Sequence, residues 1–231
     1  MQGSEAGISG FRVLGRVITW FGAGMSFIFI LIFLPARTVR FFNGWLFMGG
    51  MLIPMFFVLI YLLIKDPELL VKRTNMKERE SDQKKYVRLS ILLYLITYTI
   101  PGFDFRFHWS KVPDWLVIVS FCTMIGGYLM FVAVMLQNRY ASRVIEIQEQ
   151  QKLIDTGLYS VVRHPMYLAA TILYLSSALV LGSWYALIPM SALPFLLAFR
   201  VKNEEKVLIE GLPGYSEYIK RVRFRILPGV W

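Results

Sequence analysis

The stretch Trp115–Leu136, WLVIVSFCTMIGGYLMFVAVML, carries no charged residue over its whole length. A helix needs about 20 consecutive apolar residues to cross the hydrocarbon core of a bilayer, which is about 30 Å thick. The stretch therefore predicts a transmembrane helix, because lipid offers no hydrogen-bond partners to a backbone that is not helical. The single cysteine, Cys122, lies inside it, so the chain has neither a disulfide framework nor a metal-ligand spacing.

Five further apolar runs, separated by charged clusters, flank this one. With 56% hydrophobic residues and a mean hydropathy of +0.54, the chain exceeds the roughly 45–50% apolar content of soluble domains. Three of the runs, Tyr86–Ile100, Met166–Leu181 and Trp184–Phe199, are short. We expect their helices to extend further or to be tilted and sheltered by neighbouring helices. We predict an all-α polytopic membrane protein, a single domain over residues 1–231, with about six transmembrane helices that end in a helical hairpin. In chain order the runs are Val17–Leu34, Trp45–Ile64, Tyr86–Ile100, Trp115–Leu136, Met166–Leu181 and Trp184–Phe199.

Basic residues are distributed unevenly between alternate connections. Of the 25 lysines and arginines, 21 lie in the amino terminus, the 65–88 and 137–163 connections and the tail from Arg200. By the positive-inside rule, both termini and the catalytic face are predicted to be cytoplasmic. Orientation also explains the net charge of +10, together with attraction to anionic lipid. Membrane lipids are therefore the expected partners, and nucleic acid is not.

A polar cluster, GLYSVVRHPMY at 157–167, directly precedes the fifth apolar run. Pro165 predicts a helix start, since proline lacks the N–H that a first turn leaves unpaired anyway. Arg163 and His164 would then lie at the positive end of the helix dipole, beside free N–H groups that suit a carboxylate or a phosphate. Tyr167 falls on the same helix face as His164, three residues later.

A second polar cluster, Arg200–Glu205, follows the sixth run. Only Gly182 and Ser183 separate the fifth and sixth runs, so we expect a tight antiparallel hairpin whose open end brings the two clusters together. The result would be a pocket with both signs of charge at the membrane surface, with Tyr215 and Tyr218 nearby. The alternative is that these residues are interfacial: snorkelling arginines, a tyrosine of the aromatic belt and glutamates on a solvated helix face.

At these residues the sequence resembles the isoprenylcysteine carboxyl methyltransferase family, a membrane group that includes phospholipid N-methyltransferase relatives. The matching elements are a G-x-Y-x-x-x-R-H-P-x-Y run at Gly157–Tyr167 and E-E-x-x-L at Glu204–Leu208. The ending Leu212–Trp231 is similar to the tail of prokaryotic members. The resemblance covers residues 138–231, which would form the catalytic and cofactor-binding part.

The resemblance implies an S-adenosylmethionine-dependent methyltransferase that acts on a lipophilic acceptor at the membrane interface. An isoprenylcysteine carboxylate, another lipid or a small thiol would fit. The cofactor carries a sulfonium, an ammonium, a carboxylate and ribose hydroxyls, so its site needs both signs of charge. No metal is required, because methyl transfer is an in-line displacement that needs alignment of donor and acceptor.

The family pattern also implies roles for individual residues. The methionine end of the cofactor would meet Arg163, His164 and Tyr167, with Pro165 shaping the turn. Glu204 or Glu205 would contact the ammonium or the ribose hydroxyls. The candidate catalytic residues, which would arrange the acceptor, are Arg200 and Glu205. Further walls of the cofactor pocket would come from Tyr159, Tyr215 and Tyr218.

Two other functions remain open at this point. An NADPH-dependent membrane reductase of the steroid 5-alpha-reductase kind has a similar helix layout, but its larger cofactor would need more anion contacts than Arg163 and a helix terminus supply. A non-enzymatic carrier or assembly factor is disfavoured, because carriers often place ionisable residues within their spans. Here they gather at helix ends and in connections. The alternating tail Lys220–Arg225 is expected to lie on anionic lipid or, less favoured, to close over the cofactor.

Overall fold

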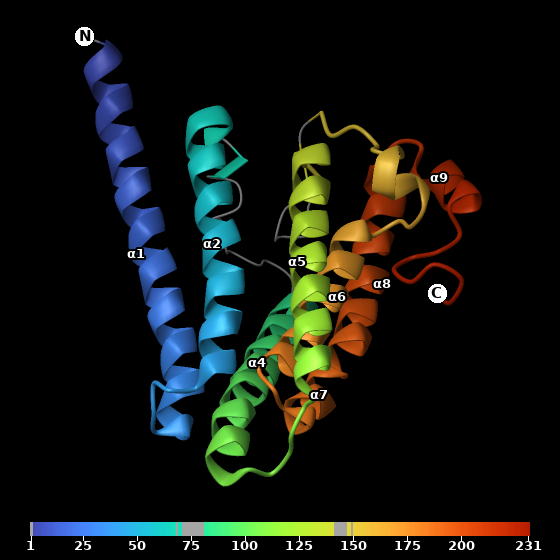
Figure 1. Ribbon diagram of the computed structural model, residues 1–231. Helices are drawn as coiled ribbons and strands as arrows, with labels where there is room; N and C mark the ends of the chain where they lie inside the picture. Colours follow the sequence, from blue (N-terminus) through green and yellow to red (C-terminus); the bar gives the residue numbers. More distant parts are fainter. Residues whose placement is uncertain (1, 68, 71–80, 141–146, 149) are drawn as a thin grey trace.

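The computed structural model describes residues 2–67, 69–70, 81–140, 147–148 and 150–231 of the chain. Every regular element within these residues is a helix, as the apolar runs predicted (Figure 1). Much of the 65–88 connection, at 71–80, lies outside the described residues. The helices are α1 (Gln2–Ala36), α2 (Phe42–Lys65), α4 (Ser81–Phe107), α5 (Asp114–Gln137), the 3₁₀ helix η1 (Gly157–Ser160), α6 (Pro165–Val180), α7 (Trp184–Met190), α8 (Leu193–Gly211) and α9 (Tyr215–Arg221).

The apolar helices identify the chain as an integral, multi-pass membrane protein. Four segments are long and apolar enough to cross a bilayer: Phe42–Lys65, Lys85–Phe107, Asp114–Gln137 and Trp184–Gly211. Two shorter apolar helices, Phe21–Ala36 and Pro165–Val180, occur where the first and fifth runs were expected. The third run extends beyond its predicted limit, to Phe107, whereas the fifth does not extend. At 1.5 Å per residue, the fifth helix is only about 24 Å long.

The sixth run is not one continuous helix, as was expected, because it breaks between α7 and α8. Ser191 and Ala192 form a turn there, and Pro194 stands in the first turn of α8. Proline lacks an N–H and its ring clashes with the carbonyl four residues before it, which is that of Met190, the last residue of α7. The break leaves α8 as the element that carries Arg200, Glu204 and Glu205.

Successive helices run up and down through the bundle (Figure 1). The amino terminus and α9 lie toward one end, and the short connections between α1 and α2, α4 and α5, and α6 and α7 lie at the other. The core is apolar and draws on several helices, with Ile32 of α1, Phe47 of α2, Met124 of α5, Leu173 of α6 and Leu193 of α8 all nearly inaccessible. This alternation brings the start of α6 and the end of α8 to the same end, as the hairpin predicted.

The closest helix contact that bears on the site is between α5 and α6. At Gly127, an added Cβ would lie 2.9 Å from the backbone nitrogen of Leu173 and 3.2 Å from the carbonyl oxygen of Ala169. Backbone atoms cannot move aside as the end of a flexible side chain can. Glycine is therefore what permits α6 to lie so close to α5.

Replacing Gly127 by alanine is expected to lower the free energy of unfolding by about 1 to 3 kcal/mol, because the added methyl group forces the two backbones apart. Gly126→Ala is the matched control, since an added Cβ there meets nothing within 4 Å. The control should be neutral or slightly stabilising, because alanine favours a helix by up to about 1 kcal/mol over glycine. Denaturation of both variants in mixed micelles measures the difference, and equal stability would contradict the packing role of Gly127.

Candidate functional site

The site begins at the first turn of α6. Helix α6 starts at Pro165, as predicted, and His164 is the residue that precedes it. The backbone N–H groups of Arg163 and His164 donate to the carbonyls of Phe224 and Arg225, at 2.9 and 2.8 Å. An anionic ligand was expected at this helix terminus. The N–H groups of Arg163 and His164, directly before the helix, are bound by the tail of the chain.

A buried carboxylate, that of Glu205, joins α8 to this turn and to the tail. Its Oε1 accepts a hydrogen bond from Arg163 Nε at 2.7 Å and lies 3.3 Å from His164 Nε2. Its Oε2 accepts from Arg225 Nε at 2.7 Å. The side chains of Arg163 and Glu205 are only 4% and 5% exposed. Because burial of a charge is costly unless it is paired and hydrogen-bonded, this cluster fixes the three segments relative to one another.

The guanidinium of Arg163 has further acceptors within the protein. Its Nη1 donates to the carbonyl oxygens of Val222 and Arg223, at 2.7 and 2.8 Å. The sequence favoured Arg163 as a partner for the methionine end of a cofactor. In the structure, Arg163 binds Glu205 and the tail. Four consecutive tail carbonyls accept hydrogen bonds there: two from the Arg163 side chain, one from its backbone N–H and one from the N–H of His164.

The neighbouring carboxylate, Glu204, takes part in a second set of contacts. It accepts a hydrogen bond from the Tyr167 hydroxyl at 2.6 Å, and that hydroxyl accepts one from Arg200 Nε at 2.9 Å. His164 Nδ1 lies 3.9 Å from Glu204 Oε1, and the His164 ring stacks on that of Tyr167 with centroids 5.7 Å apart. Arg200 also lies over the Tyr86 ring. The shared face of His164 and Tyr167 is thus confirmed, and the imidazole lies between two carboxylates.

A cavity opens beside these contacts, with an empty space of about 850 Å³ including the part that is open to solvent. Most of the predicted cofactor residues line it: Tyr159, Arg163, His164, Tyr167, Glu204, Tyr215 and Tyr218. Pro165, Glu205 and Arg200 are not among its lining residues. The structure therefore separates the paired glutamates. Glu204 faces the cavity, and Glu205 lies behind it.

Two tyrosines of α9 form part of the cavity wall. The Tyr218 hydroxyl donates to the carbonyl of Tyr159 at 2.7 Å. The Tyr215 hydroxyl is buried and has no hydrogen-bond partner among the described residues. Burial raises the pKa of Tyr215, and the nearby carboxylates of Glu205 and Glu204 raise it further. The hydroxyl therefore keeps its proton at neutral pH and can donate to a ligand, since buried tyrosine hydroxyls usually have a partner.

Sequence reasoning missed more than half of the lining residues. Asn138 donates from Nδ2 to the Tyr159 hydroxyl at 2.9 Å, and Lys152 lies at the exposed rim. Nothing in the composition of the 137–163 connection distinguishes these residues, because their position at the cavity is a tertiary feature. The lining residues that were not predicted are Asn138, Tyr140, Gln151, Lys152, Leu153, Ile154, Met166, Val207, Leu208 and Leu212.

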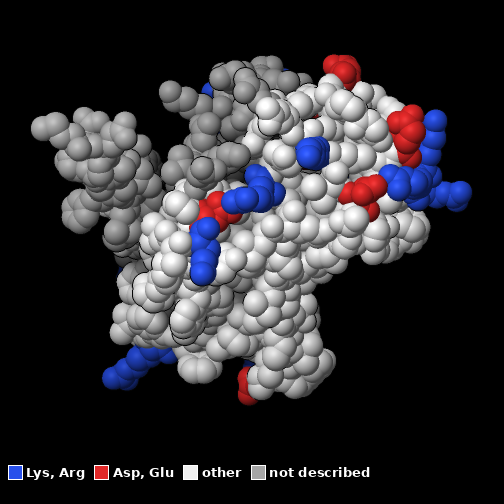
Figure 2. Space-filling view, turned by 90° about the horizontal axis from the view of Figure 1, so that it is seen from above, with Lys and Arg blue, Asp and Glu red and all other residues white. Residues whose placement is uncertain are grey.

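The end of the molecule that carries the site is shown in Figure 2. Charged side chains are scattered over a largely uncharged surface, and basic and acidic groups occur side by side. One such pair joins Arg221 of α9 to Asp155 at 2.6 Å. Among the described residues no group of three or more His, Cys, Asp or Glu side chains is arranged to hold a metal ion.

Residues 115–212 match the family described as phospholipid methyltransferase. The matched segment begins in α5, includes the connection that folds over the cavity and ends just after α8. It therefore contains the turn at Arg163–Tyr167 and both glutamates. The tail that binds Arg163 lies beyond it.

The fold is similar to that of a solved structure, the eukaryotic intramembrane Ras methyltransferase isoprenylcysteine carboxyl methyltransferase, determined without a monobody. The TM-score is 0.52, with 17% sequence identity over 91% of this chain and 84% of that chain. At this identity the likeness shows the fold. No curated protein matches the sequence.

In its apolar helix bundle and in these two matches, the chain is similar to membrane methyltransferases. More particularly, residues 115–212 carry the likeness to the phospholipid methyltransferase family, and the fold as a whole is like that of isoprenylcysteine carboxyl methyltransferase. The family resemblance read from Gly157–Tyr167 and Glu204–Leu208 is thereby confirmed.

Proposed function

We propose that the chain transfers a methyl group from S-adenosylmethionine to a lipophilic acceptor at the membrane interface. The observation that carries the proposal is the cavity within and beside the family-matched segment. It combines the Glu204 carboxylate with several tyrosines, among them Tyr215, whose hydroxyl has no partner among the described residues. An activated methyl group on a sulfonium is the chemistry that this cofactor supplies when it is bound.

The donor and acceptor groups of the cavity suit this cofactor. Glu204 offers a carboxylate for an ammonium or for ribose hydroxyls, and Tyr215 offers a buried hydroxyl donor. Tyrosine faces attract cations, which suits a sulfonium. Lys152, on the exposed rim, supplies a positive charge for the carboxylate of the cofactor. We therefore propose that Lys152, rather than Arg163, binds the carboxylate of the cofactor.

The residues behind the cavity orient those that line it. Tyr167 receives a hydrogen bond from Arg200 and donates one to Glu204, so the Glu204 carboxylate is held toward the cavity. Pro165 starts α6 and thereby sets the positions of His164 and Tyr167. Alignment of donor and acceptor to this degree is the main contribution that a protein makes to an in-line displacement.

Arg200 and Glu205 were the expected catalytic residues, and we keep Arg200 as the candidate that arranges the acceptor. It is buried beside Tyr86 and Tyr167, and it donates to the Tyr167 hydroxyl that binds Glu204. We give Glu205 a positioning role, because three basic side chains already surround its two oxygens. The acceptor is an isoprenylcysteine carboxylate-like group, another lipid or a small thiol.

In this proposal all six apolar segments cross the membrane, with both termini and the cavity facing the cytoplasm. The up-and-down course of the helices, which puts the amino terminus and α9 toward the same end, supports the arrangement (Figure 1). So does the excess of lysine and arginine in the connections at that end. A lipophilic acceptor would enter from the bilayer, while the cofactor would arrive from the cytoplasm.

Calorimetric titration of the detergent-purified protein with S-adenosylhomocysteine tests the proposal. Glu204→Gln should raise the Kd at least tenfold, because hydrogen bonds to charged groups contribute about 1.5 to 3 kcal/mol and 1.4 kcal/mol is a factor of ten. Glu210→Gln, at an exposed position on the same helix, is the matched control and should bind like the wild type. A folded wild type that binds NADPH and not S-adenosylhomocysteine would replace the methyltransferase with the reductase. If neither ligand bound, the carrier would be favoured.

A further inference from the structure

We propose that Arg225 is a positioning residue of the cavity, which clamps the tail of the chain onto the first turn of α6 by way of Glu205. The tail clamp consists of residues 222–225 together with Trp231. Its consequence for cofactor binding rests on the proposed function, whereas the clamp itself is a property of the fold.

Four consecutive carbonyls of the tail are bound to the first turn of α6. Those of Val222 and Arg223 accept from the Arg163 guanidinium, and those of Phe224 and Arg225 accept from the backbone N–H groups of Arg163 and His164. Val222 is buried, and so is Ile226. The tail was expected to lie on lipid. It packs on protein instead, because these carbonyls and apolar side chains find partners there.

One tail side chain, that of Arg225, reaches the buried carboxylate. Its Nε donates to Glu205 Oε2 at 2.7 Å, and its guanidinium lies over the Trp231 ring at 4.9 Å from the centroid. The carbonyl of Trp231 accepts from the N–H groups of Arg225 and Ile226, at 2.9 and 3.1 Å. Arg223, two residues before Arg225, has an exposed side chain.

The two oxygens of Glu205 have different partners, and Arg225 is the partner of Oε2. Oε1 binds Arg163 and lies near His164, both of which line the cavity, and Oε2 binds Arg225. Without Arg225 the carboxylate would keep one oxygen unpaired in a buried place, and it would be free to turn. Loss of this pair therefore loosens the wall of the cavity that Arg163 and His164 form.

Hydrogen exchange of the full chain in detergent tests the clamp without any ligand. In the wild type the amides of Arg163 and His164 are protected by the tail carbonyls, and Arg225→Gln should increase their exchange rate about tenfold or more, by raising the population of the open tail. Arg223→Gln removes the same charge at an exposed position and should leave exchange unchanged. Equal protection of both amides in Arg225→Gln and the wild type would overturn the proposal.

A second measurement connects the clamp to the cavity. Arg225→Gln should weaken S-adenosylhomocysteine binding about tenfold, Arg225→Lys should restore part of the affinity, and Trp231→Ala should have little effect once Arg225 is already glutamine. Unchanged affinity in Arg225→Gln, despite faster exchange, would overturn the positioning role. Failure of the wild type to bind would count against the proposed function alone, and the exchange comparison would still decide on the clamp.

Discussion

Replacing Glu205 by alanine is expected to lower the free energy of unfolding by about 3 to 5 kcal/mol, which is the cost of breaking a buried ion pair and leaving a charge behind. Arg163, only 4% exposed, would lose its charged partner, and Arg225 would lose its contact with α8. Three segments that this carboxylate joins, namely α8, the first turn of α6 and the tail, would separate more easily. Denaturation in mixed micelles, followed by tryptophan fluorescence, measures the change.

The control is the adjacent residue. Glu204 is 26% exposed and lines the cavity, so Glu204→Ala should cost less than about 1.5 kcal/mol of stability while it weakens cofactor binding. Similar loss of stability in both variants would contradict the division between a carboxylate that supports the fold and one that faces the ligand. Comparison of the two variants thus distinguishes an effect on stability from an effect on ligand binding.

Replacing Asp104 by alanine is expected to lower the free energy of unfolding by about 3 kcal/mol, because three donors would lose their acceptor in a buried place. Asp104 is 1% exposed and accepts from Ser110 N at 2.7 Å, Ser110 Oγ at 2.6 Å and Ser183 Oγ at 2.5 Å. Ser183 in turn accepts from the N–H of Ala186 and caps α7. The carboxylate therefore joins the end of α4 to the turn between α6 and α7.

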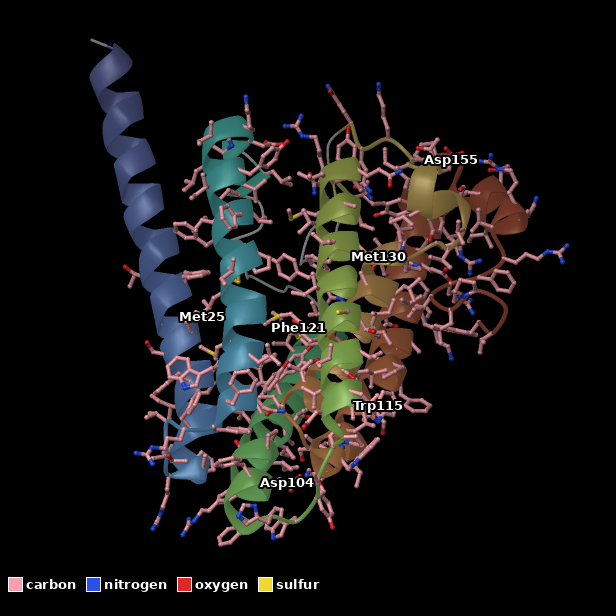
Figure 3. The ribbon with its side chains drawn as sticks, in the orientation of Figure 1. Met25, Asp104, Trp115, Phe121, Met130 and Asp155 are labelled. Atoms are coloured by element: carbon pink, nitrogen blue, oxygen red, sulfur yellow. The ribbon has the colours of Figure 1, made fainter. Side chains whose placement is uncertain are left out.

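This cluster lies at the end of the molecule opposite the cavity, as the positions of Asp104 and Asp155 in Figure 3 show. Asp114→Ala is the matched control, because Asp114 is exposed in the first turn of α5 and contributes at most about 1 kcal/mol through the helix dipole. The same denaturation measurement compares the two variants. If Asp104→Ala were as stable as Asp114→Ala, the buried hydrogen bonds would not hold the turn.

Most of the fold was predictable because lipid leaves few choices to the backbone. A run such as Trp115–Leu136 can only be a helix in a bilayer, and the spacing of six such runs predicts the up-and-down bundle. The break in the sixth run, by contrast, was missed. Pro189 and Pro194 were visible in the sequence, but hydropathy alone joins α7 to α8 into one apolar segment that is long enough to cross a bilayer.

Part of the site was also predictable from local chemistry. Pro165 signals a helix start, the three-residue spacing puts His164 and Tyr167 on one face, and the short turn at Gly182 returns α8 to the start of α6. These local rules brought Glu204 and Glu205 near the turn. They did not show that Arg163, which lines the cavity, is also bound to Glu205.

The sequence by itself determined that the protein lies in a membrane, that its fold is all-α and that two polar clusters meet. Hydropathy and helix-start signals suffice for this, because they act over a few consecutive residues. Only the tertiary structure decided which glutamate faces the cavity, which arginines pair with the other glutamate and where the tail lies. Adjacent residues on a helix point about 100° apart, so Glu204 and Glu205 meet different neighbours. Those neighbours, Tyr167 in one case and Arg163 with Arg225 in the other, come from segments far away along the chain.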